Sequence, residues 1–422
     1  MTLDEDEFTP ETVEYIRTAD DEQRKEMGQF FTPRSVRERL ARRLFDERTV
    51  SEPSVLDPAC GTGEFLLTVS EYVEDAELVG WEVDEEVAEV ARRVVPEAEI
   101  KTTDALHAEP EREFDVVIGN PPYFEFDPSD ELRERYSESV YGRVNIYSLF
   151  IQKGIEVLKD DGYLAYVVPP SVKNGAYFSA VREYVLETCE VVHLSTLDDA
   201  HLFHGANQTP MLMILRKGGD SERYVFSKNG VTILSEEAEY LREAFDGART
   251  LLDMGYKVET GVLVWNQNRD VLTDSDDEDT VPVVWSRNIT DEGMVLDNHD
   301  KPQYVESEDV GDKIREGPAI AVNRVVGKPG SGSLRACLIS EGTEFVGENH
   351  VNLIFPPETK QTTLGGSDEQ ETLPIEDVHR QLNSEEKTEI LRSITGNTQV
   401  SKNELLKLFP FSTGATVRRE TQ

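Results

Sequence analysis

Hydrophobic and polar positions follow two different patterns along this chain. Between residues 55 and 217, short apolar runs typical of buried strands alternate with segments that have apolar residues at helical spacing. One such helix is predicted at residues 145–162, ended by Gly162. Seven runs are predicted as strands, at residues 55–59, 78–84, 99–105, 114–120, 163–169, 191–197 and 211–217. Strands and helices alternating at these lengths predict a doubly wound α/β sheet.

The pattern changes after Lys217, which indicates a second domain. Residues 221–255 read as a helical connector, and residues 256–422 contain short β-prone runs, loops and, near the end, a helix, a turn and a second helix. We therefore predict a polar, acidic N-terminal segment at 1–27, an α/β domain at 28–220, the connector, and a mixed α+β domain at 256–422.

The net charge changes what can be expected of the surface. The 422 residues include 84 acidic and 43 basic side chains, a net charge of −41. Because the acids are spread through core-forming sequence, we interpret them as the hydrated surface of a protein from a salty cytoplasm. The alternative is an acidic interaction protein that avoids nucleic acid. At about 1 M salt the Debye length is only about 3 Å, so such a surface would hardly repel DNA phosphates.

Other classes of protein are disfavoured by what the sequence lacks. The three cysteines, Cys60, Cys189 and Cys337, are too scattered for a disulfide framework or a zinc site, and no metal site is predicted. No apolar run approaches the roughly 18 residues of a membrane helix. The first residues, MTLDEDEFTP, do not resemble a signal peptide. The expectation is a soluble, cytoplasmic protein that has no contact with a membrane.

A glycine-rich turn follows the first predicted strand. The run Asp57-Pro58-Ala59-Cys60-Gly61-Thr62-Gly63 lies where open α/β sheets bind ligands, and glycines let the backbone approach a ligand closely. The turn lacks the full dinucleotide spacing, and no Gly-Lys-Ser/Thr follows. Cys60 is interpreted as a small buried residue and not as a nucleophile. Five residues of the turn are predicted to bind a cofactor: Asp57, Pro58, Ala59, Gly61 and Gly63.

Acidic residues at successive strand ends indicate the shape of that cofactor. Asp57 is placed to meet an ammonium group, Glu82 could accept hydrogen bonds from two ribose hydroxyls, and Asp104, beside Ala105, could accept one from an adenine amine. A ligand with an amino acid at one end, a ribose in the middle and adenine at the other end fits all three. The alternative is that these acids are solvated loop residues in an acidic chain.

The tetrapeptide Asn120-Pro121-Pro122-Tyr123 ends the fourth predicted strand. An amine conjugated to an aromatic ring is a poor nucleophile, and two acceptors aimed at its hydrogens can localise its lone pair. The Asn120 side-chain oxygen and the Pro121 carbonyl could be these acceptors, on a turn that the prolines make rigid. Tyr123 offers a ring on which an extruded base can stack. The alternative is a simple turn at the end of a strand.

In its order of motifs, FFTP, DPACGTG, WEVD, TDA and NPPY followed by a long second domain, the chain resembles the gamma class of amino-methyltransferases from restriction–modification systems. The resemblance implies a seven-stranded Rossmann-like methyltransferase sheet that binds S-adenosyl-L-methionine, followed by a target-recognition domain. It also implies that Thr32 and Pro33 cover the methionine end of the cofactor and that Phe203 is a second wall of a flipped-base pocket. VWNQN, GENHVN and SITGNTQVSKNEL are similar to recognition domains of this class.

The activity implied is transfer of a methyl group to the N6 amine of a flipped-out adenine at a specific site in double-stranded DNA. The stretch before the methyltransferase motifs is too short for a nuclease domain, so any cleavage is expected from a separate restriction subunit. The rivals are an RNA or protein-glutamine amine methyltransferase, a cytosine-N4 enzyme and a non-catalytic DNA-binding subunit. Candidate DNA contacts in the second domain are Asn266, Gln267, Arg287, Arg324, Lys328 and Arg335; for each of them a surface position or a phosphate contact is favoured over base reading.

Overall fold

The computed structural model describes residues 5–20, 28–46, 52–109, 112–197, 210–290, 293–296, 300–324, 333–358, 372–394 and 399–412. The chain divides into two compact units, Met1–Val225 and Phe226–Gln422. Each unit has its own sheets and its own buried core, so each is described by itself.

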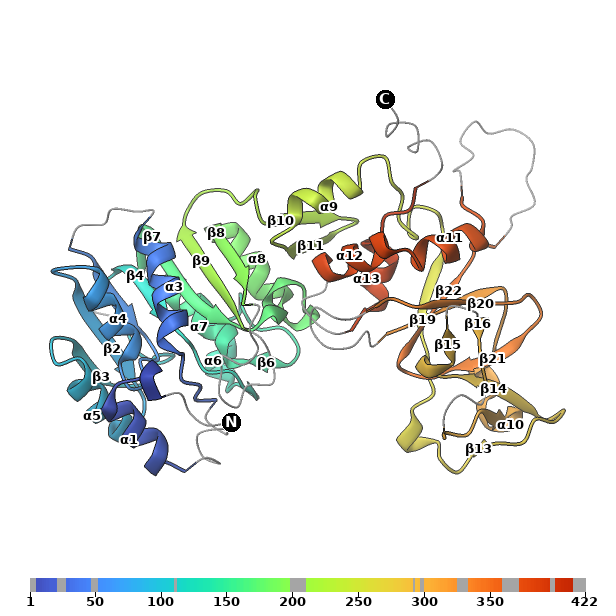
Figure 1. Ribbon diagram of the computed structural model, residues 1–422, viewed down its shortest axis with the longest axis horizontal. Coiled ribbons are helices and arrows are strands. Elements are labelled where there is room, and N and C mark those ends of the chain that lie inside the picture. The colour runs from blue at the N-terminus through green and yellow to red at the C-terminus, as the bar shows by residue number, and fades with distance from the viewer. Residues whose placement is uncertain are drawn as a thin grey trace. The chain divides into compact units, whose positions relative to one another are not determined.

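The first unit is built on a seven-stranded sheet in the order β3-β2-β1-β4-β7-β9-β8 (Figure 1). β1, β2, β3, β4 and β7 pair in parallel, whereas β9 runs antiparallel to both β7 and β8. The predicted α/β fold with seven strands is confirmed. The strands are β1 (Ser54–Asp57), β2 (Glu77–Glu82), β3 (Glu99–Thr102), β4 (Phe114–Gly119), β7 (Leu158–Val168), β8 (Cys189–Thr196) and β9 (Met211–Lys217).

Helices cover both faces of this sheet because side chains alternate between the faces along each strand. Ala165 and Val167 of β7 share a core cluster with α3 (Arg34–Phe45), α4 (Glu64–Tyr72) and α5 (Glu85–Val94). The next residues along β7, Leu164 and Tyr166, face α7 (Ile146–Glu156). A Cβ at Gly154 in α7 would lie 2.4 Å from Leu164 Cδ1, so glycine permits this close packing. The smaller elements of the unit are β5 (Glu125–Phe126), α6 (Asp130–Arg135), β6 (Val144–Asn145), η2 (Pro170–Lys173), η3 (Ala176–Phe178) and α8 (Ser179–Thr188).

One predicted boundary is wrong. The helix expected to end at Gly162 ends at Glu156, and β7 already begins at Leu158. Gly162 instead lies within β7, where the register with β4 shifts and Asp161 adopts a φ of 62°. A glycine at a strand irregularity and a glycine that ends a helix look alike in sequence.

The N-terminal residues are structured and belong to the first unit. A short 3₁₀ turn, η1 (Glu5–Glu7), leads into α1 (Pro10–Thr18), which packs beside α5. Thr9 is the N-cap of α1, and its side chain accepts a hydrogen bond from the Thr12 backbone N–H. The segment predicted as a separate acidic stretch therefore contributes to the packing of the first unit.

The second unit contains two larger sheets and two hairpins. A four-stranded antiparallel sheet has the order β12-β22-β19-β20, and a five-stranded sheet has the order β13-β17-β14-β21-β18. The hairpins are β10 (Val225–Lys228) with β11 (Val231–Leu234) and β15 (Ile289–Thr290) with β16 (Gly293–Met294). The strands of the sheets are β12 (Lys257–Thr260), β13 (Leu272–Thr273), β14 (Thr280–Val284), β17 (Tyr304–Glu306), β18 (Arg315–Glu316), β19 (Ala319–Asn323), β20 (Ala336–Ile339), β21 (Glu344–Gly347) and β22 (Val351–Phe355).

A helical layer completes the core of the second unit. Phe226, Leu241 and Phe245, from the predicted connector, share one cluster with the C-terminal helices and with Ile320 and Ile354 of the four-stranded sheet. Residues 226–255 therefore pack as part of this unit. Its helical elements are α9 (Ala238–Ala244), η4 (Trp265–Gln267), η5 (Ser286–Asn288), α10 (Ser307–Val310), η6 (Gly311–Lys313), α11 (Ile375–Leu382), α12 (Glu385–Ile394) and α13 (Lys402–Lys407).

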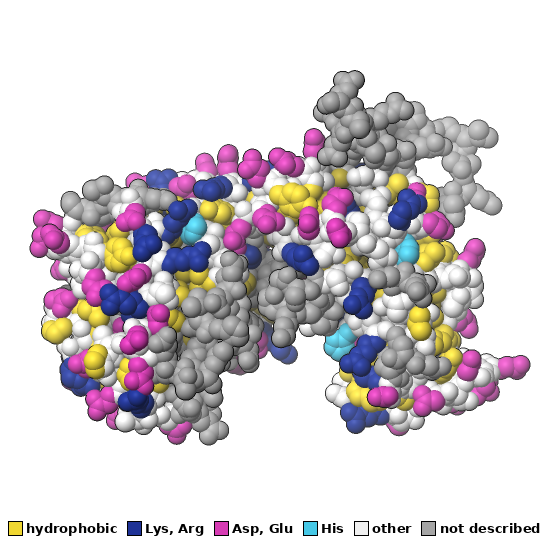
Figure 2. Space-filling view, viewed as in Figure 1, with side chains coloured by type: hydrophobic (Ala, Val, Ile, Leu, Met, Phe, Trp, Pro, Cys, Tyr) yellow, Lys and Arg dark blue, Asp and Glu magenta, His cyan; other side chains and the backbone are white. Residues whose placement is uncertain are grey.

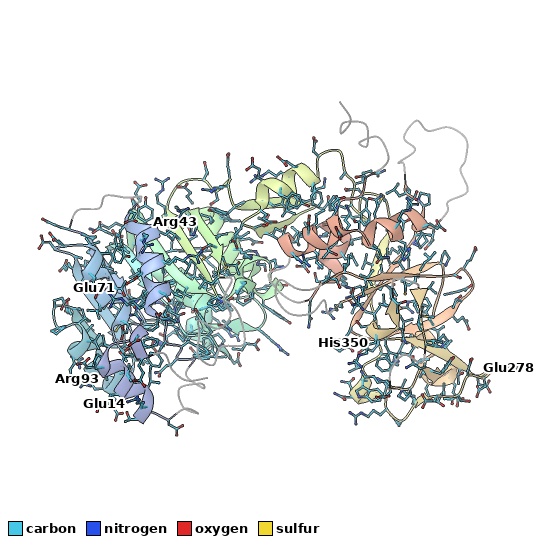
Figure 3. The ribbon with its side chains drawn as sticks, viewed as in Figure 1. Glu14, Arg43, Glu71, Arg93, Glu278 and His350 are labelled. Atoms are coloured by element: carbon cyan, nitrogen blue, oxygen red, sulfur yellow. The ribbon has the colours of Figure 1, made fainter. Side chains whose placement is uncertain are left out.

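Acidic side chains are distributed over the visible face of each unit (Figure 2). Glu71, Arg93 and Glu278 are examples of charged side chains that point away from the ribbon (Figure 3). Among the described residues, no helix has both the length and the apolar character needed to cross a bilayer.

Leu40 tests the packing of α3 on the sheet. Its side chain is completely buried, whereas its neighbour Arg39 is exposed on the same helix. We expect Leu40→Ala to lower the free energy of unfolding by about 2–5 kcal/mol and Arg39→Ala to change it by less than about 0.5 kcal/mol. Urea unfolding followed by circular dichroism measures both. Equal losses for the two variants would contradict this packing.

Candidate active site

A cavity of about 290 Å³ lies at the carboxyl ends of β1, β2 and β4. Parallel strands end at the same edge of a sheet, so the residues that follow them meet there. The residues that line the cavity include Asp57, Pro58, Ala59, Gly61, Glu82, Asp104, Ala105, Asn120 and Pro122 among those predicted, together with Phe8, Phe30, Phe31, Thr32, Arg37 and Glu64.

The glycine turn begins with a buried carboxyl group. Asp57 ends β1 with 1% of its surface exposed, and its Oδ1 accepts a hydrogen bond from Ala59 N at 3.1 Å. Burial raises the pKa of Asp57 to about 8, so the carboxyl group is protonated at neutral pH until a cation approaches it. Gly63 has a φ of 85°, a left-handed conformation that favours glycine, and it is the N-cap of α4.

Glu82 holds the other side of this turn. Its two oxygens accept hydrogen bonds from Gly61 N at 2.9 Å and from Asp84 N at 3.0 Å. The side chain is 8% exposed, and burial raises its pKa. Each oxygen keeps a lone pair, so Glu82 could also accept hydrogen bonds from two hydroxyl groups of a ligand.

Asp104 and Ala105 lie at the rim next to β3. The Asp104 side chain is 49% exposed and already binds Leu106 N at 3.0 Å and His107 Nδ1 at 2.8 Å. Ala105 is buried. Cys60, which also lines the cavity, is buried, and burial raises the pKa of its thiol well above the usual value. Cys60 is therefore a neutral thiol, which disfavours a nucleophilic role.

Asn120 follows β4 and lines the cavity with Pro122. Its Nδ2 donates to the Phe30 carbonyl oxygen at 3.1 Å. The Tyr123 hydroxyl lies within hydrogen-bonding distance of both Asn120 Oδ1 and the Val167 carbonyl oxygen. The Asn120 amide is therefore held in a defined orientation by groups on both of its sides.

Tyr123 itself is packed between other aromatic rings. The Phe30 ring is stacked on Tyr123 with a centroid distance of 5.8 Å and an interplanar angle of 25°. Tyr147 contacts Tyr123 edge-on at 6.0 Å. Neither Tyr123 nor Pro121 lines the cavity, and Pro121 is buried. No role for Phe30 followed from the sequence. Phe30 lies beside Asn120 because residues 28–32 fold against the turn.

Thr32 and Pro33 form the link between that segment and α3. Thr32 lines the cavity, is 5% exposed, and has a hydroxyl group without a hydrogen-bond partner among the described residues. Pro33 is buried as the N-cap residue of α3 and is not part of the lining. A buried hydroxyl without a partner, on a residue that lines a cavity, is a candidate contact for a polar ligand.

The remaining candidates that the structure describes do not line this cavity. Phe203 and Lys328 lie outside the described residues. In the second unit Asn266, Gln267, Arg287 and Arg335 are exposed, and Arg324 Nη1 donates to the Asn349 carbonyl oxygen at 3.2 Å. Beside Asn266 and Gln267, Lys301 lies over both the Trp265 and the Trp285 rings, at 5.1 and 4.4 Å from their centroids.

Comparisons with known proteins place the chain in a family. The model of the N-6 DNA Methylase family matches residues 13–311. Type II methyltransferase M.CvrRI of Paramecium bursaria Chlorella virus XZ-6E is 29% identical over 305 residues, which are 70% of this chain and 76% of that protein. Modification methylase CviBIII of Paramecium bursaria Chlorella virus NC1A is 26% identical over 360 residues, which are 84% of this chain and 89% of that protein.

Among solved structures, one similar protein from Listeria monocytogenes is described as a class I S-adenosylmethionine-dependent methyltransferase. The TM-score is 0.42 at 23% identity, and the match covers 49% of this chain and 65% of that one. The family match spans most of the chain and includes the residues that line the cavity, except Phe8. The chain therefore belongs to the N-6 DNA Methylase family and is an S-adenosyl-L-methionine-dependent DNA methyltransferase.

Proposed function

We propose that this protein transfers the methyl group of S-adenosyl-L-methionine to the N6 amine of a flipped-out adenine in a specific DNA sequence. We further propose that it is the modification component of a restriction–modification or related defence system, paired with a separate nuclease. The observation that carries the proposal is that Asn120 and the acidic strand ends Asp57 and Glu82 line the same cavity.

The cavity has the polar groups that this cofactor needs. Asp57 would meet the ammonium group, Glu82 the ribose hydroxyls and Asp104 the adenine amine, in the order in which β1, β2 and β3 lie in the sheet. The unpartnered Thr32 hydroxyl would bind the methionine end. When bound, the cofactor supplies a methyl group on a sulfonium, so the transfer requires no covalent enzyme intermediate.

Asn120 and Pro121 would act on the base. Asn120 Oδ1 has two lone pairs, so it can accept from the adenine amine while it remains in contact with the Tyr123 hydroxyl. The Pro121 carbonyl would accept the second amine hydrogen. Because Asn120 is already oriented by Phe30 and Tyr123, little reorganisation is needed as positive charge develops on the nitrogen.

A base can stack on the face of Tyr123 that Phe30 covers only if Phe30 moves. If the backbone moves with the ring, Asn120 Nδ2 also loses the carbonyl that accepts its hydrogen bond. We infer that residues 28–31 shift when the base enters and that Phe203 contributes a further wall of the base site. Burial raises the pKa of Tyr123 well above its usual value, so its hydroxyl stays neutral throughout.

Residues 256–422, which lie within the second unit, are the proposed target-recognition domain. Base edges are distinguishable in the major groove, and the exposed Asn266, Gln267 and Arg287 have side chains that can read them. The cations around Trp265 support this assignment, since Arg269 and Lys301 concentrate positive charge beside Asn266 and Gln267 in an otherwise acidic protein.

A product assay tests the proposed target. The protein is mixed with labelled cofactor and duplex DNA in high salt, and the DNA is digested to nucleosides. We expect the label in N6-methyladenosine. Label in N4-methylcytosine, or label that appears only with RNA or protein substrates, would contradict the proposal.

Asn120 tests the chemistry separately from binding. We expect Asn120→Ala to lower methyl transfer at least about 100-fold, because one of the two acceptors for the amine is lost. Asn120→Asp keeps an acceptor oxygen and should retain more activity than the alanine variant. Cofactor affinity, measured by calorimetry, should change less than threefold in both variants. Unchanged turnover in Asn120→Ala would eliminate the assigned role.

The pH dependence of stability tests whether Asp57 is the buried carboxyl group at the amino-acid end of the cofactor. The folded protein holds the Asp57 proton up to about pH 8, whereas the unfolded chain releases it near pH 4, so rising pH between these values destabilises the wild type. Asp57→Asn mimics the neutral form. We expect this variant to unfold at a higher temperature than the wild type by a margin that grows from pH 5 to pH 8.

At pH 8 the difference should exceed about 1 kcal/mol, while cofactor affinity should fall because the ammonium group has lost its counter-charge. Thermal unfolding without cofactor and calorimetry with it measure the two effects. A stability difference that is independent of pH would show that Asp57 is not buried as described.

A further inference from the structure

The N-terminal segment reaches the cofactor cavity. Phe8, between η1 and α1, lines the cavity together with Arg37 of α3 and Glu64 of α4. Glu64 is the residue directly after the glycine turn, next to β1, so this group lies at the end of the cavity assigned to the amino-acid part of the cofactor. No role for these three residues follows from the sequence motifs.

A buried ion pair holds this region together. Arg37 Nη2 lies 2.8 Å from Glu64 Oε2, and the two side chains are only 3% and 8% exposed. Burial lowers the pKa of Arg37 because water no longer stabilises the charged guanidinium, and the charge of Glu64 opposes this effect. If one partner of such a pair moves away, the other charge is left buried and unpaired, which is unfavourable. The pair therefore favours the arrangement of α3 and α4 in which the two side chains meet.

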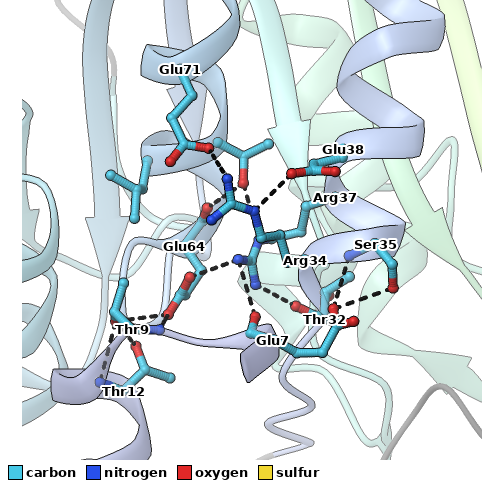
Figure 4. A network of polar contacts seen from close by, with 12 residues as sticks. Glu7, Thr9, Thr12, Thr32, Arg34, Ser35, Arg37, Glu38, Glu64 and Glu71 are labelled. Atoms are coloured by element: carbon cyan, nitrogen blue, oxygen red, sulfur yellow. Dashed lines mark hydrogen bonds and ion pairs between the residues drawn. The ribbon is translucent and has the colours of Figure 1, made fainter. Parts of the chain in front are cut away.

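Each member of the pair also contacts a different segment of the chain (Figure 4). Glu64 Oε1 accepts from Thr9 N and Thr9 Oγ1, both at 2.8 Å, which ties it to the N-cap of α1. Arg37 Nη1 donates to the Thr32 carbonyl oxygen at 2.6 Å, and its Nε donates to Thr68 Oγ1 at 3.1 Å. The pair thus joins the start of α1 to Thr32, which lines the cavity.

Phe8 is fixed by the same residues. The Arg37 guanidinium carbon lies 5.7 Å from the centroid of the Phe8 ring, and Phe31 contacts that ring edge-on at 6.3 Å. Glu7, the preceding residue, accepts from Ser35 N at 2.9 Å and from Ser35 Oγ at 3.2 Å at the start of α3. Contacts on both sides therefore hold the ring against the cavity.

We propose that Phe8 is a cofactor-binding residue that covers the methionine end of S-adenosyl-L-methionine, and that Arg37 and Glu64 are positioning residues that hold Phe8 and Thr32 against the cofactor. The inference rests on the proposed assignment of the cavity to the cofactor. It makes the N-terminal segment Glu5–Thr18 part of the cofactor site.

Three ligands separate a local role from a general loss of structure. S-adenosyl-L-methionine and S-adenosylhomocysteine carry the amino-acid end, whereas methylthioadenosine lacks it. We expect Phe8→Ala in the full chain to weaken the first two about tenfold by calorimetry and methylthioadenosine less than twofold. Phe8→Leu, which keeps an apolar side chain, should lose about threefold. Unchanged affinities, or equal losses for all three ligands, would overturn the role of Phe8.

The ion pair is tested with graded variants. Glu64→Gln keeps an acceptor for Thr9 but removes the charge opposite Arg37, and Glu64→Ala removes both. We expect the affinity for S-adenosyl-L-methionine to fall more in the alanine variant than in the glutamine variant, again without loss for methylthioadenosine. Arg34→Ala is the matched control, because Arg34 pairs with Glu38 and Glu71 on the exposed side of α3 and does not line the cavity.

Hydrogen exchange gives a readout that does not depend on affinity. In the wild type, S-adenosyl-L-methionine should slow amide exchange in α1, and methylthioadenosine should not. Equal exchange in α1 with and without S-adenosyl-L-methionine would overturn the inference. Glu82→Ala is the reference for the cavity itself and should weaken all three ligands. If it weakens none, the assignment of the cavity falls, and this inference falls with it.

Discussion

The close approach of Gly119 to the Asp57 carboxyl group is the constraint on which the site depends. A Cβ at Gly119 would lie 2.6 Å from Asp57 Oδ1, so glycine is needed for β4 to pass beside the buried carboxyl group at the end of β1. The next residue is Asn120, and its amide therefore leaves the sheet at a fixed place relative to the glycine turn. The pairing of β1 with β4 in this way brings Asp57 and Asn120 to one cavity.

Burial of the Asp57 and Glu82 carboxyl groups lowers the stability of the protein, and the two groups differ in their contacts. Asp57 is buried without a cation beside it among the described residues, which is why its pKa rises to about 8. Glu82 is also buried, but it holds the backbone N–H groups of Gly61 and Asp84 and so shapes the turn before any ligand arrives. Two buried carboxyl groups in fixed positions suit a ligand that carries a cation and hydroxyl groups. Without such a ligand their burial is unfavourable.

Much of the fold and part of the site could be predicted from sequence, for physical reasons. The seven strands have clear apolar runs, and Asp57, Glu82 and Asn120 follow strands, so the parallel topology alone places them at one edge. Gly162 was misread because a strand irregularity and a helix end call for the same residue type. The places of Phe8 and of Phe30, the first residue of the FFTP motif, could not be predicted because their neighbours are distant in sequence. Thr9, beside Phe8, contacts Glu64 across 55 positions, and Phe30 contacts Asn120 across 90.

The Arg37–Glu64 pair shows why the N-terminal segment is better explained by function than by stability. Burying two charges costs about as much as their attraction returns, and apolar side chains of similar size often stabilise such a place more. Apolar substitutes, however, could not at once hold the Thr32 carbonyl, the Thr9 N-cap and the face of the Phe8 ring. The Arg37–Glu64 pair makes several directed contacts and so fixes three chain segments around one end of the cavity. We attribute the presence of a buried ion pair at this place to that geometric requirement.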